Sequence, residues 1–473
     1  MNASRRHFLR HAGALAAALP GARAPLSLGL AGLAALAAQS STAANTSNGY
    51  RALVCLFFHG GSDSHNWVVP IDATGYAQYA AARDDLAWPM ERLQPIGSTR
   101  QAAGRAFAMP VELQPLRSWY DSGRAAVLAN VGPLLRPTTR QQYDADSGLP
   151  AKLFSHNDQA STWQSLFPEG APSGWGGRMG DILMSANPYP VFTAISATGN
   201  AVYLAGQNVT QYQVGGSGPV GVSGLANDWM FGSNSLQTVM RRSLVRGHSN
   251  GDPFSAEYGA VMRRSIDTAA SLQAALAQVS VPALSTTGVA LGAAAPVALA
   301  NDGLARQLQL VARLIGAGQA LGMRRQVFMV SMGGFDTHAT QMRDQPGHMA
   351  RVSLSVDWFL NALQGLGLLN NVVLFTASDF GRTLLSNGDG SDHGWGSHHF
   401  VAGGAVRGGD IYGRFPVTTT GTADEVGSGR LLPSTSVTEL AANLGGWMGL
   451  TRSEQELVLP GLGQFSSTPL GFL

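Results

Sequence analysis

The stretch RALVCLFFHGGSDSHN, residues 51–66, decides the fold of this chain. Its first eight residues form an almost unbroken apolar run, which is typical of a strand buried on both faces of a parallel sheet. The run ends at two adjacent glycines, and polar residues that can bind metals stand around them: His59, Asp63 and His65. We therefore expect a buried strand whose carboxyl end opens into a tight, polar turn.

The rest of the chain alternates strand-like and helical segments. Apolar strand-like runs recur at 125–132, 326–332, 371–377 and 399–404. Helical spacing is found at 111–122, 157–166, 177–185, 305–321, 341–369 and 434–449. This alternation predicts an α/β protein with a doubly wound, largely parallel sheet. The segment at about 187–300 is rich in Gly, Ser, Ala and Val, so we expect an inserted cap or subdomain within a single domain spanning 45–473.

The N-terminus has the pattern of an export signal. SRRHFLR (residues 4–10) is followed by a long Ala, Leu and Gly segment and by the small residues STAA (41–44). This pattern predicts a twin-arginine signal peptide at 1–44, with the translocase as a partner during export and a periplasmic or secreted product. Pro20, Arg23 and Pro25 interrupt the apolar segment and disfavour a stable membrane anchor.

Composition excludes several classes of partner. Lys and Arg total 31, and four of these, all Arg, lie in residues 1–44, which leaves 27 basic against 29 acidic residues. A chain so balanced has no basic stripe for nucleic acid or for an anionic membrane surface. Cys55 is the one cysteine, so no intrachain disulfide can form, and its apolar surroundings predict a core position.

Residues that can bind metals follow several of the predicted strands. Asp336 and His338 come after 326–332, Asp379 comes after 371–377, and DHGWGSHH (392–399) contributes His393 and His398. Because ligands of open α/β sheets bind at the carboxyl ends of the strands, these side chains and Asp63 are expected to converge. Mixed Asp and His ligands suit Zn²⁺ or Mn²⁺, and their number allows one or two ions. Taken singly, GGSD is better explained as a tight turn in which Asp63 caps its own loop, whereas DTH suits a helix N-cap followed by an exposed His as well as it suits a metal site.

Six segments together carry a resemblance to a known family: RALVCLFFHGGSDSHNWVVP, LFSHNDQASTWQS, SGWGGRMGD, GGFDTH, ASDFGRT and DHGWGSHHFVAGG. The chain resembles the twin-arginine-exported bacterial family catalogued as domain of unknown function 1501, which looks like a branch of the alkaline phosphatase and sulfatase superfamily. The resemblance implies an alkaline-phosphatase-like α/β core with a metal site at the strand ends. That family has no firmly assigned substrate.

The resemblance also implies roles for single residues. Asp63 matches the metal-binding Asp after the superfamily's first strand, and Asp379 matches the Asp of its Asp-His strand end. Asp336 and His338 resemble a later Asp/His pair, although they lie closer together than in alkaline phosphatases. Phe380 stands where the superfamily has His, so a second ion would need His393 instead. His398 or His399 would match the last His of the superfamily.

The nucleophile is left open among three hydroxyls: Thr138, Thr139 and Ser155. Ser155 precedes a predicted helix whose N–H groups suit an oxyanion, but a serine there can equally be a simple helix cap. Three arginines could clamp a phosphate or sulfate group: Arg140, Arg178 and Arg382. Arg382 is preferred because it follows Asp379 so closely.

These features support two functions. The first is a metal-dependent hydrolase or transferase acting on a phosphate or sulfate ester, either a small molecule or a polymer. Ser155 and Arg382 are its expected catalytic residues, and a metal-bound hydroxide is the alternative to Ser155 as the attacking group. The second is a non-catalytic metal-binding protein of the same fold, active in surface-polymer export or in assembling a secreted partner. A redox enzyme is disfavoured because the sequence has no Cys cluster, dinucleotide glycine fingerprint or haem motif.

Overall fold

The computed structural model describes residues 49–216, 218–219, 225, 233, 235–245 and 253–473. These residues belong to one compact unit, Ala44–Leu473. The predicted signal peptide, 1–44, lies outside the described residues. Within the described residues, no helix combines the length and the hydropathy needed to cross a bilayer.

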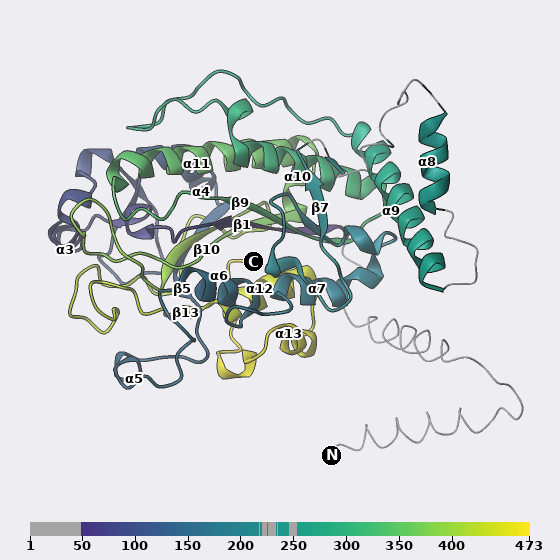
Figure 1. Ribbon diagram of the computed structural model, residues 1–473. Helices are drawn as coiled ribbons and strands as arrows, with labels where there is room; N and C mark the ends of the chain where they lie inside the picture. The colour runs from purple at the N-terminus through teal and green to yellow at the C-terminus, as the bar shows by residue number, and fades with distance from the viewer. Residues whose placement is uncertain (1–48, 217, 220–224, 226–232, 234, 246–252) are drawn as a thin grey trace, which may run out of the picture. The chain divides into compact units, whose positions relative to one another are not determined.

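A ten-stranded sheet forms the centre of this unit (Figure 1). In pairing order its strands are β12 (Ile411–Tyr412), β5 (Ala125–Gly132), β11 (Ser397–Ala402), β10 (Val372–Ser378), β1 (Arg51–Phe58), β9 (Arg325–Met332), β6 (Ala194–Ser196), β7 (Tyr212–Gly215) and β8 (Gly218–Pro219), with β13 (Thr435–Ser436) also beside β5. β1 lies parallel to β10 on one side and to β9 on the other, and β9 continues in parallel to β6. The predicted α/β fold with a largely parallel sheet is confirmed.

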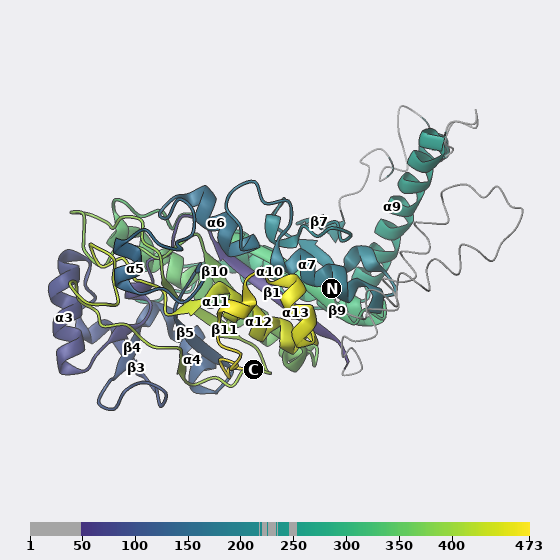
Figure 2. The ribbon, with the colours of Figure 1, turned by 90° about the horizontal axis from the view of Figure 1, so that it is seen from below.

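Helices cover both faces of the sheet. On one face lie α4 (Gln114–Asp121), α10 (Gly303–Ala320) and α11 (Gln341–Gly365), and on the other lie α6 (His156–Ser165), α7 (Trp175–Leu183), α12 (Val437–Met448) and α13 (Arg452–Val458) (Figures 1 and 2). Alternate residues of β1 enter two separate cores: Val54 and Leu56 pack on the first side, and Leu53, Cys55 and Phe57 on the second. This double burial explains why the strand is apolar along its whole length.

The five predicted strands correspond to β1, β5, β9, β10 and β11. One feature of the sheet differs from a purely parallel arrangement, because β11 runs antiparallel to β10 and to β5. The connection from β10 to β11, residues 379–396, contains no helix, and a chain without a crossover helix returns antiparallel to its neighbour. The structure also adds α3 (Ala73–Arg83) and a small sheet of β2 (Val69–Pro70), β4 (Phe107–Pro110) and β3 (Leu93–Ile96).

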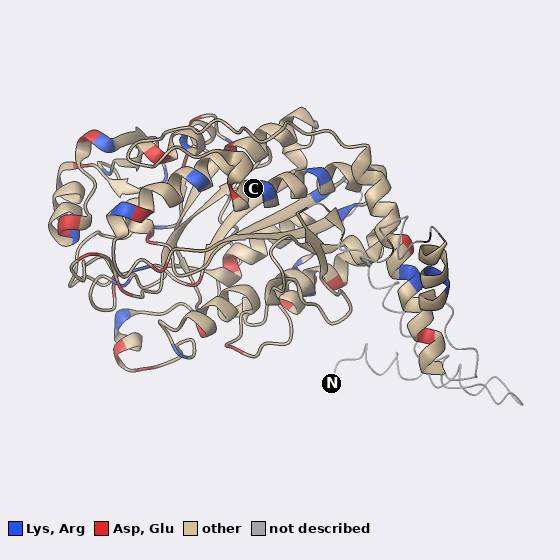
Figure 3. Ribbon diagram, turned by 45° about the horizontal axis from the view of Figure 1, so that its top comes forward, with Lys and Arg blue, Asp and Glu red and all other residues tan. Residues whose placement is uncertain are grey.

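The segment expected as an insertion, about 187–300, divides into two parts. Its beginning joins the main sheet as β6, β7 and β8. Beyond these strands, α8 (Leu236–Val245) packs on α9 (Pro253–Ala277), and α9 packs on α10. Ion pairs occur on α8 and α9, where Figure 3 shows blue and red segments together: Arg241 with Asp267, and Arg264 with Glu257.

The turn after β1 depends on two glycines. Gly60 and Gly61 have φ angles of +113° and +80°, in the left-handed region that glycine adopts without strain. A Cβ atom on Gly60 would lie 2.4 Å from the backbone nitrogen of Asp336, which follows β9. One on Gly61 would lie 2.2 Å from the ring of Phe380, which follows β10. The absence of side chains therefore lets the ends of three parallel strands meet.

Replacing Gly61 with alanine should destabilise the protein strongly, because the new methyl group needs space that the Phe380 ring occupies. Gly123→Ala is the matched control: Gly123 has φ +74°, but no atom lies within 4 Å of its Cβ position. We expect Gly61→Ala to lower the free energy of unfolding by about 1–3 kcal/mol more than Gly123→Ala, measured by urea denaturation. Equal losses for the two variants would show that the turn does not pack against Phe380.

Three buried histidines lie near β1 and β11. Burial lowers the pKa of His65 to about 4 and that of His399 to about 3, and it takes the pKa of His398 well below its usual value. The rings are therefore neutral in the folded protein, whereas in the unfolded chain they take up protons below a pKa of about 6.5. Stability associated with them is present above that pH and is lost as the pH falls.

Acidification should therefore destabilise the fold even when no metal is bound. As the pH falls from 6.5 to 5, each ring that stays neutral in the folded protein lowers the free energy of unfolding by roughly 2 kcal/mol, because the unfolded chain takes up the proton instead. His399→Gln keeps a polar group beside Thr376, whose Oγ1 lies 3.2 Å from Nδ1 of His399, but does not titrate. We expect the urea midpoint of this variant to depend less on pH than that of the native protein, with a chelator present in both. An unchanged pH dependence would contradict the neutral, buried state of His399.

Candidate metal centre

Three imidazoles and one carboxylate meet at the carboxyl edge of the parallel strands. We call them the His/Asp cluster: His156, Asp336, His338 and His393. His156 is the first residue of α6, Asp336 and His338 follow β9, and His393 lies in the connection between β10 and β11. One ligand atom each from His156, Asp336 and His393 lies within 4.8 Å of the others. Three segments far apart in the sequence thus contribute to one site.

The ring nitrogens of the His/Asp cluster face the Asp336 carboxylate. Its Oδ1 lies 3.2 Å from Nε2 of His338 and 3.5 Å from Nε2 of His393. Its Oδ2 lies 3.5 Å from Nε2 of His156. The Nε2 atoms of His338 and His393 are themselves 2.9 Å apart.

Each of the three rings is oriented by an acceptor on its other nitrogen. The Nδ1 contacts are His156 to Asp379 Oδ2 at 2.8 Å, His338 to Asp392 Oδ1 at 3.2 Å, and His393 to the Phe154 carbonyl at 2.8 Å. A carbonyl or carboxylate can only accept, so Nδ1 carries the proton and Nε2 of a neutral ring presents its lone pair. Two such lone pairs facing each other are stabilised by a cation placed between them. Acceptors behind ligating histidines are the usual support of a metal site.

The donor set fits a divalent ion of the predicted kind. Tetrahedral Zn²⁺, with bonds of about 2.0–2.1 Å, separates its ligand atoms by roughly 3.3–3.4 Å. The contacts within the His/Asp cluster, 2.9–3.5 Å, bracket that separation. Three imidazoles with one carboxylate suit Zn²⁺ or Mn²⁺ and not Ca²⁺, which takes an all-oxygen cage.

Protonation favours the ligand forms of Asp336 and His393. Partial burial tends to raise the pKa of Asp336, but the hydrogen bond and charge of Arg382, together with nearby histidines, outweigh it and lower the pKa below the usual value. Burial is the main reason that the pKa of His393 is lowered, with the charges of neighbouring basic groups adding to it. At neutral pH the carboxylate is therefore charged and the His393 ring is neutral.

Asp379, a predicted metal ligand, supports the His/Asp cluster from behind. Its buried Oδ2 accepts hydrogen bonds from the backbone N–H of Gly60, at 2.9 Å, and from Nδ1 of His156. Its Oδ1 is also buried and has no hydrogen-bond partner among the described residues. Asp379 thus orients His156 through Oδ2, and its Oδ1 keeps Asp379 a candidate metal ligand.

Two other predicted ligands do not join the His/Asp cluster. The Asp63 carboxylate is buried in an ion pair with Arg83 and also accepts from Gln341 and Gln345. A buried guanidinium needs an anionic partner, so the carboxylate of Asp63 is already engaged. His398 is buried on β11, where Nδ1 accepts the N–H of Asn130 at 3.0 Å and the ring stacks on Phe415. Instead of ligating with the cluster, both residues hold the interior together.

Arg382 does not take the substrate-clamping position that we expected. Its guanidinium is buried and donates to the carbonyl of Ser391 at 3.1 Å, to the carbonyl of Gly60 at 3.0 Å and to Asp336 Oδ1 at 2.9 Å. These bonds hold the turn after β1 against the segments after β9 and β10. Arg382 therefore positions Asp336 from inside the protein.

Ser155, the preferred nucleophile, is the N-cap residue of α6 and precedes His156. Its hydroxyl makes no capping bond to the helix backbone but donates to Asp158 Oδ2 at 2.9 Å. The backbone N–H groups of residues 156–158 have no acceptor among the described residues. The structure thus places Ser155 next to a residue of the His/Asp cluster and at the positive end of a helix.

His156 is the member of the His/Asp cluster that the sequence analysis did not include among the ligands. It lies at the start of a helix and not directly after a strand, so the pattern of polar residues at strand ends cannot find it. In the sequence it directly follows Ser155, within LFSHND.

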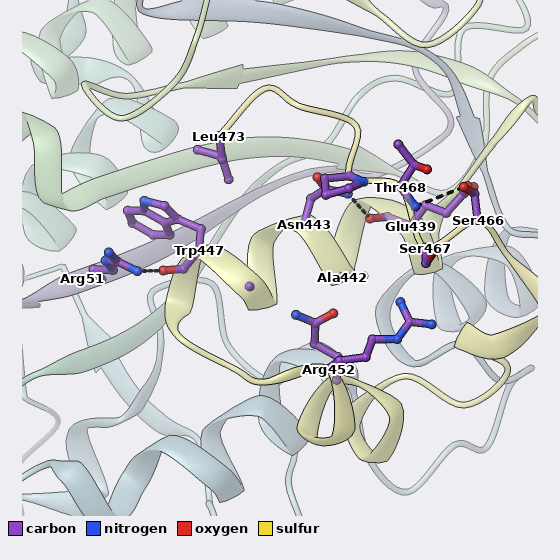
Figure 4. A pocket seen from close by; sticks show the side chains of 13 residues that line it. Arg51, Glu439, Ala442, Asn443, Trp447, Arg452, Ser466, Ser467, Thr468 and Leu473 are labelled. Atoms are coloured by element: carbon purple, nitrogen blue, oxygen red, sulfur yellow. Dashed lines mark hydrogen bonds between the residues drawn. The ribbon is translucent and has the colours of Figure 1, made fainter. Parts of the chain in front are cut away.

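A different pocket, of about 410 Å³, lies between α12 and α13 (Figure 4). Arg51, at the start of β1, lines it, so it is about 25 Å from the far end of that eight-residue strand. Its polar groups serve the fold: Asn443 donates to the Glu439 carbonyl and accepts from the N–H of Leu470. This pocket is a crevice beside the C-terminal segment and is separate from the His/Asp cluster.

Comparison with solved structures finds sulfatases and a periplasmic domain. The PsFucS1 sulfatase from Pseudoalteromonas sp. is 10% identical, with 90% of this chain and 72% of that chain covered and a TM-score of 0.33. The C-terminal periplasmic domain of EcEptC from Escherichia coli is 10% identical, with 90% of both chains covered and a TM-score of 0.32. A 2-O GAG sulfatase is 12% identical, with 89% and 76% covered and a TM-score of 0.30. No curated protein matches the chain.

A family model described as "Protein of unknown function (DUF1501)" matches residues 251–459. The matched stretch contains GGFDTH, ASDFGRT and DHGWGSHHFVAGG, and hence three of the four members of the His/Asp cluster. His156 lies before it. Over residues 251–459, this chain is similar to the DUF1501 family that its motifs indicate.

Proposed function

We propose that this chain is a metal-dependent hydrolase or transferase that acts on a phosphate or sulfate ester. The observation that carries the proposal is the His/Asp cluster, in which three imidazoles, each fixed through Nδ1, direct Nε2 at Asp336. It lies at the carboxyl edge of parallel strands, where α/β proteins bind their ligands. A divalent ion held there supplies positive charge that stabilises a phosphoryl or sulfuryl group during transfer.

The start of α6 supports an anionic substrate. The N–H groups of residues 156–158, which lack protein acceptors, and the helix dipole both favour a phosphate or sulfate oxygen. His156 belongs to the same turn of helix, so an anion bound there lies beside the His/Asp cluster. In this proposal the backbone of α6 replaces the arginine clamp that the sequence analysis expected.

Ser155 is the nucleophile in this proposal. Its Oγ forms a bond to phosphorus or sulfur while the bond to the ester oxygen breaks, and its proton moves to Asp158 Oδ2, to which it is already hydrogen-bonded. The ester oxygen leaves with the electron pair of the broken bond and takes a proton from water, so the alcohol departs neutral. Asp158 is buried, with Lys152 Nζ 3.7 Å from Oδ2. In a hydrolase, water then takes the phosphoryl or sulfuryl group from Ser155. In a transferase, an acceptor alcohol takes it.

A second candidate is a non-catalytic metal-binding protein of the same fold, serving surface-polymer export or the assembly of a secreted partner. The observation that favours it is the state of the three arginines expected to clamp an anion. Arg140 pairs with Asp144, Arg178 donates to the carbonyls of Ser165 and Val458, and Arg382 is enclosed. A site without a free guanidinium suits a protein that keeps the ion without turnover.

Export by the twin-arginine translocase, to the periplasm or beyond the cell, is part of the proposal. It rests on SRRHFLR and the segment that follows. That route carries folded proteins, so the ion can be bound before export.

Removal of His393 should abolish metal binding. We expect the native protein to hold about one equivalent of zinc or manganese, measured by inductively coupled plasma mass spectrometry, and His393→Ala to hold none. His348→Ala is the control, because His348 lies on α11 outside the His/Asp cluster. Asp379→Asn should lower metal affinity by about 10–100-fold, the usual effect of losing a group that orients a ligand.

Other outcomes are equally informative. Complete loss of the ion in Asp379→Asn would place Asp379 among the ligands through Oδ1. A native protein that neither contains nor takes up a transition metal would contradict the metal centre itself.

The proposed chemistry predicts separable effects on turnover and on metal content. The metal-loaded protein should hydrolyse 4-nitrophenyl phosphate or 4-nitrophenyl sulfate. Ser155→Ala should lose this activity while retaining the ion, and Asp158→Asn should lower kcat by about 10²–10⁴-fold. Thr138→Ala, a change at an alternative hydroxyl, should leave kcat unchanged. Metal bound without turnover of either ester would favour the non-catalytic protein, and activity that survives in Ser155→Ala would exclude Ser155 as nucleophile.

A further inference from the structure

A pocket of about 340 Å³ adjoins the His/Asp cluster on the α6 side. We call it the α6 pocket. Thirteen residues line it, the polar ones being His59, Asn157, Ser161, Gln164, Glu169, Thr198 and Asn200. One of its residues, Asn157, directly follows His156 of the cluster on α6, and another, His59, precedes Gly60, whose N–H binds Asp379. The pocket and the His/Asp cluster are therefore connected through the start of α6 and the turn after β1.

Several side chains of the α6 pocket have one atom held by the protein and one without a protein partner. Gln164 Oε1 accepts the N–H of Tyr203 at 3.2 Å, and Asn200 Oδ1 accepts from Gln211 at 3.1 Å. Asn157 Nδ2 donates to Glu169 Oε1 at 3.2 Å. Among the described residues, no partner is found for Gln164 Nε2, Asn200 Nδ2, Asn157 Oδ1 or Glu169 Oε2. The bonds that these side chains make hold them in place and leave the four atoms open to a ligand.

The charge of the α6 pocket excludes one class of ligand. No lysine or arginine lines it, and Glu169 is its one acidic residue, so a second anionic group would be repelled. The available groups are two amide N–H donors, an amide oxygen and a carboxylate oxygen. A hydroxyl group both donates and accepts, so several hydroxyls on one ligand match this set.

The remaining lining is small and apolar, and it suits the C–H surface of a ring. Ala160, Ala171, Ala201, Val202 and Met329 form this part of the wall. The volume lies at the lower end of the range for small-molecule pockets, about 300–1,000 Å³. A compact ligand that combines hydroxyl groups with C–H faces satisfies both parts of the lining.

We propose that the α6 pocket binds the alcohol part of the ester and that this part is a neutral, polyhydroxylated ring, that is, a sugar. The ionised phosphate or sulfate group then lies at the start of α6, beside the His/Asp cluster. This assignment rests on the proposed function for the ester, whereas the sugar binding follows from the pocket alone.

Two binding experiments test the two parts separately. Saturation-transfer NMR with a fixed panel of neutral sugars (glucose, galactose, mannose, fucose and their methyl glycosides) reports on the pocket. Isothermal titration of the metal-loaded protein with inorganic phosphate reports on the centre. Asn200→Leu removes a donor and fills space at an exposed position, and Ser467→Leu, in the crevice between α12 and α13, is the matched control.

We expect at least one sugar of the panel to bind the native protein, His393→Ala and Ser467→Leu equally, and to bind Asn200→Leu at least tenfold more weakly. Phosphate should show the opposite dependence, lost in His393→Ala and kept in Asn200→Leu. In turnover, Asn200→Leu should raise KM about tenfold for the phosphate ester of the bound sugar, whereas Ser467→Leu should leave that KM unchanged.

The failures are distinguishable. If no sugar of the panel binds, or if Asn200→Leu binds sugars as tightly as the native protein, the proposal for the α6 pocket is overturned even when phosphate binds and esters are hydrolysed. If sugars bind in the predicted pattern but neither metal nor phosphate does, the pocket assignment holds and the proposed ester chemistry fails.

Discussion

The site depends on how closely the backbone after β1 approaches the segments after its two neighbours. Gly60 and Gly61 leave no room for a Cβ atom against Asp336 and Phe380. Because the glycines come this close, the N–H of Gly60 reaches Asp379 and its carbonyl accepts from Arg382. A bulkier turn would separate these segments and disperse the donors of the His/Asp cluster.

Hydrogen bonds from the surrounding residues to the members of the His/Asp cluster determine what the cluster can bind. Two carboxylates and a carbonyl fix the tautomers of the three rings, and Arg382 holds the remaining member of the cluster, Asp336, in its charged form. Asp379 and Arg382, which the motifs suggested as a ligand and a clamp, thus contact members of the cluster and hold them in place. Asp63 does not contact the cluster at all; it forms a buried ion pair that neutralises Arg83. The same side-chain types occur in the cluster and around it, so residue type alone cannot separate ligand from support.

The proposed metal ligand, nucleophile and substrate pocket all involve residues of α6. Its first residue is His156, its cap is Ser155, its free N–H groups face the anion in our proposal, and Asn157 and Gln164 line the α6 pocket. In our proposal, residues of this one helix contact both the phosphate or sulfate group and the alcohol part of the substrate. This helix belongs to the face of the sheet opposite α10 and α11, where it packs on β10.

The sequence by itself determined the α/β class, the positions of the main strands and helices, and the edge of the sheet at which the site lies. Apolar runs and helical periodicity are local properties, and parallel strands bring their carboxyl ends to one edge whatever the details. Asp336, His338 and His393 could be found in this way. Only the tertiary structure decided that His156 joins them, that Asp63 and His398 do not, and that β11 runs antiparallel. These outcomes depend on which buried charge each carboxylate meets and on which helix packs beside the strand ends, and both are set by contacts between residues distant in the chain.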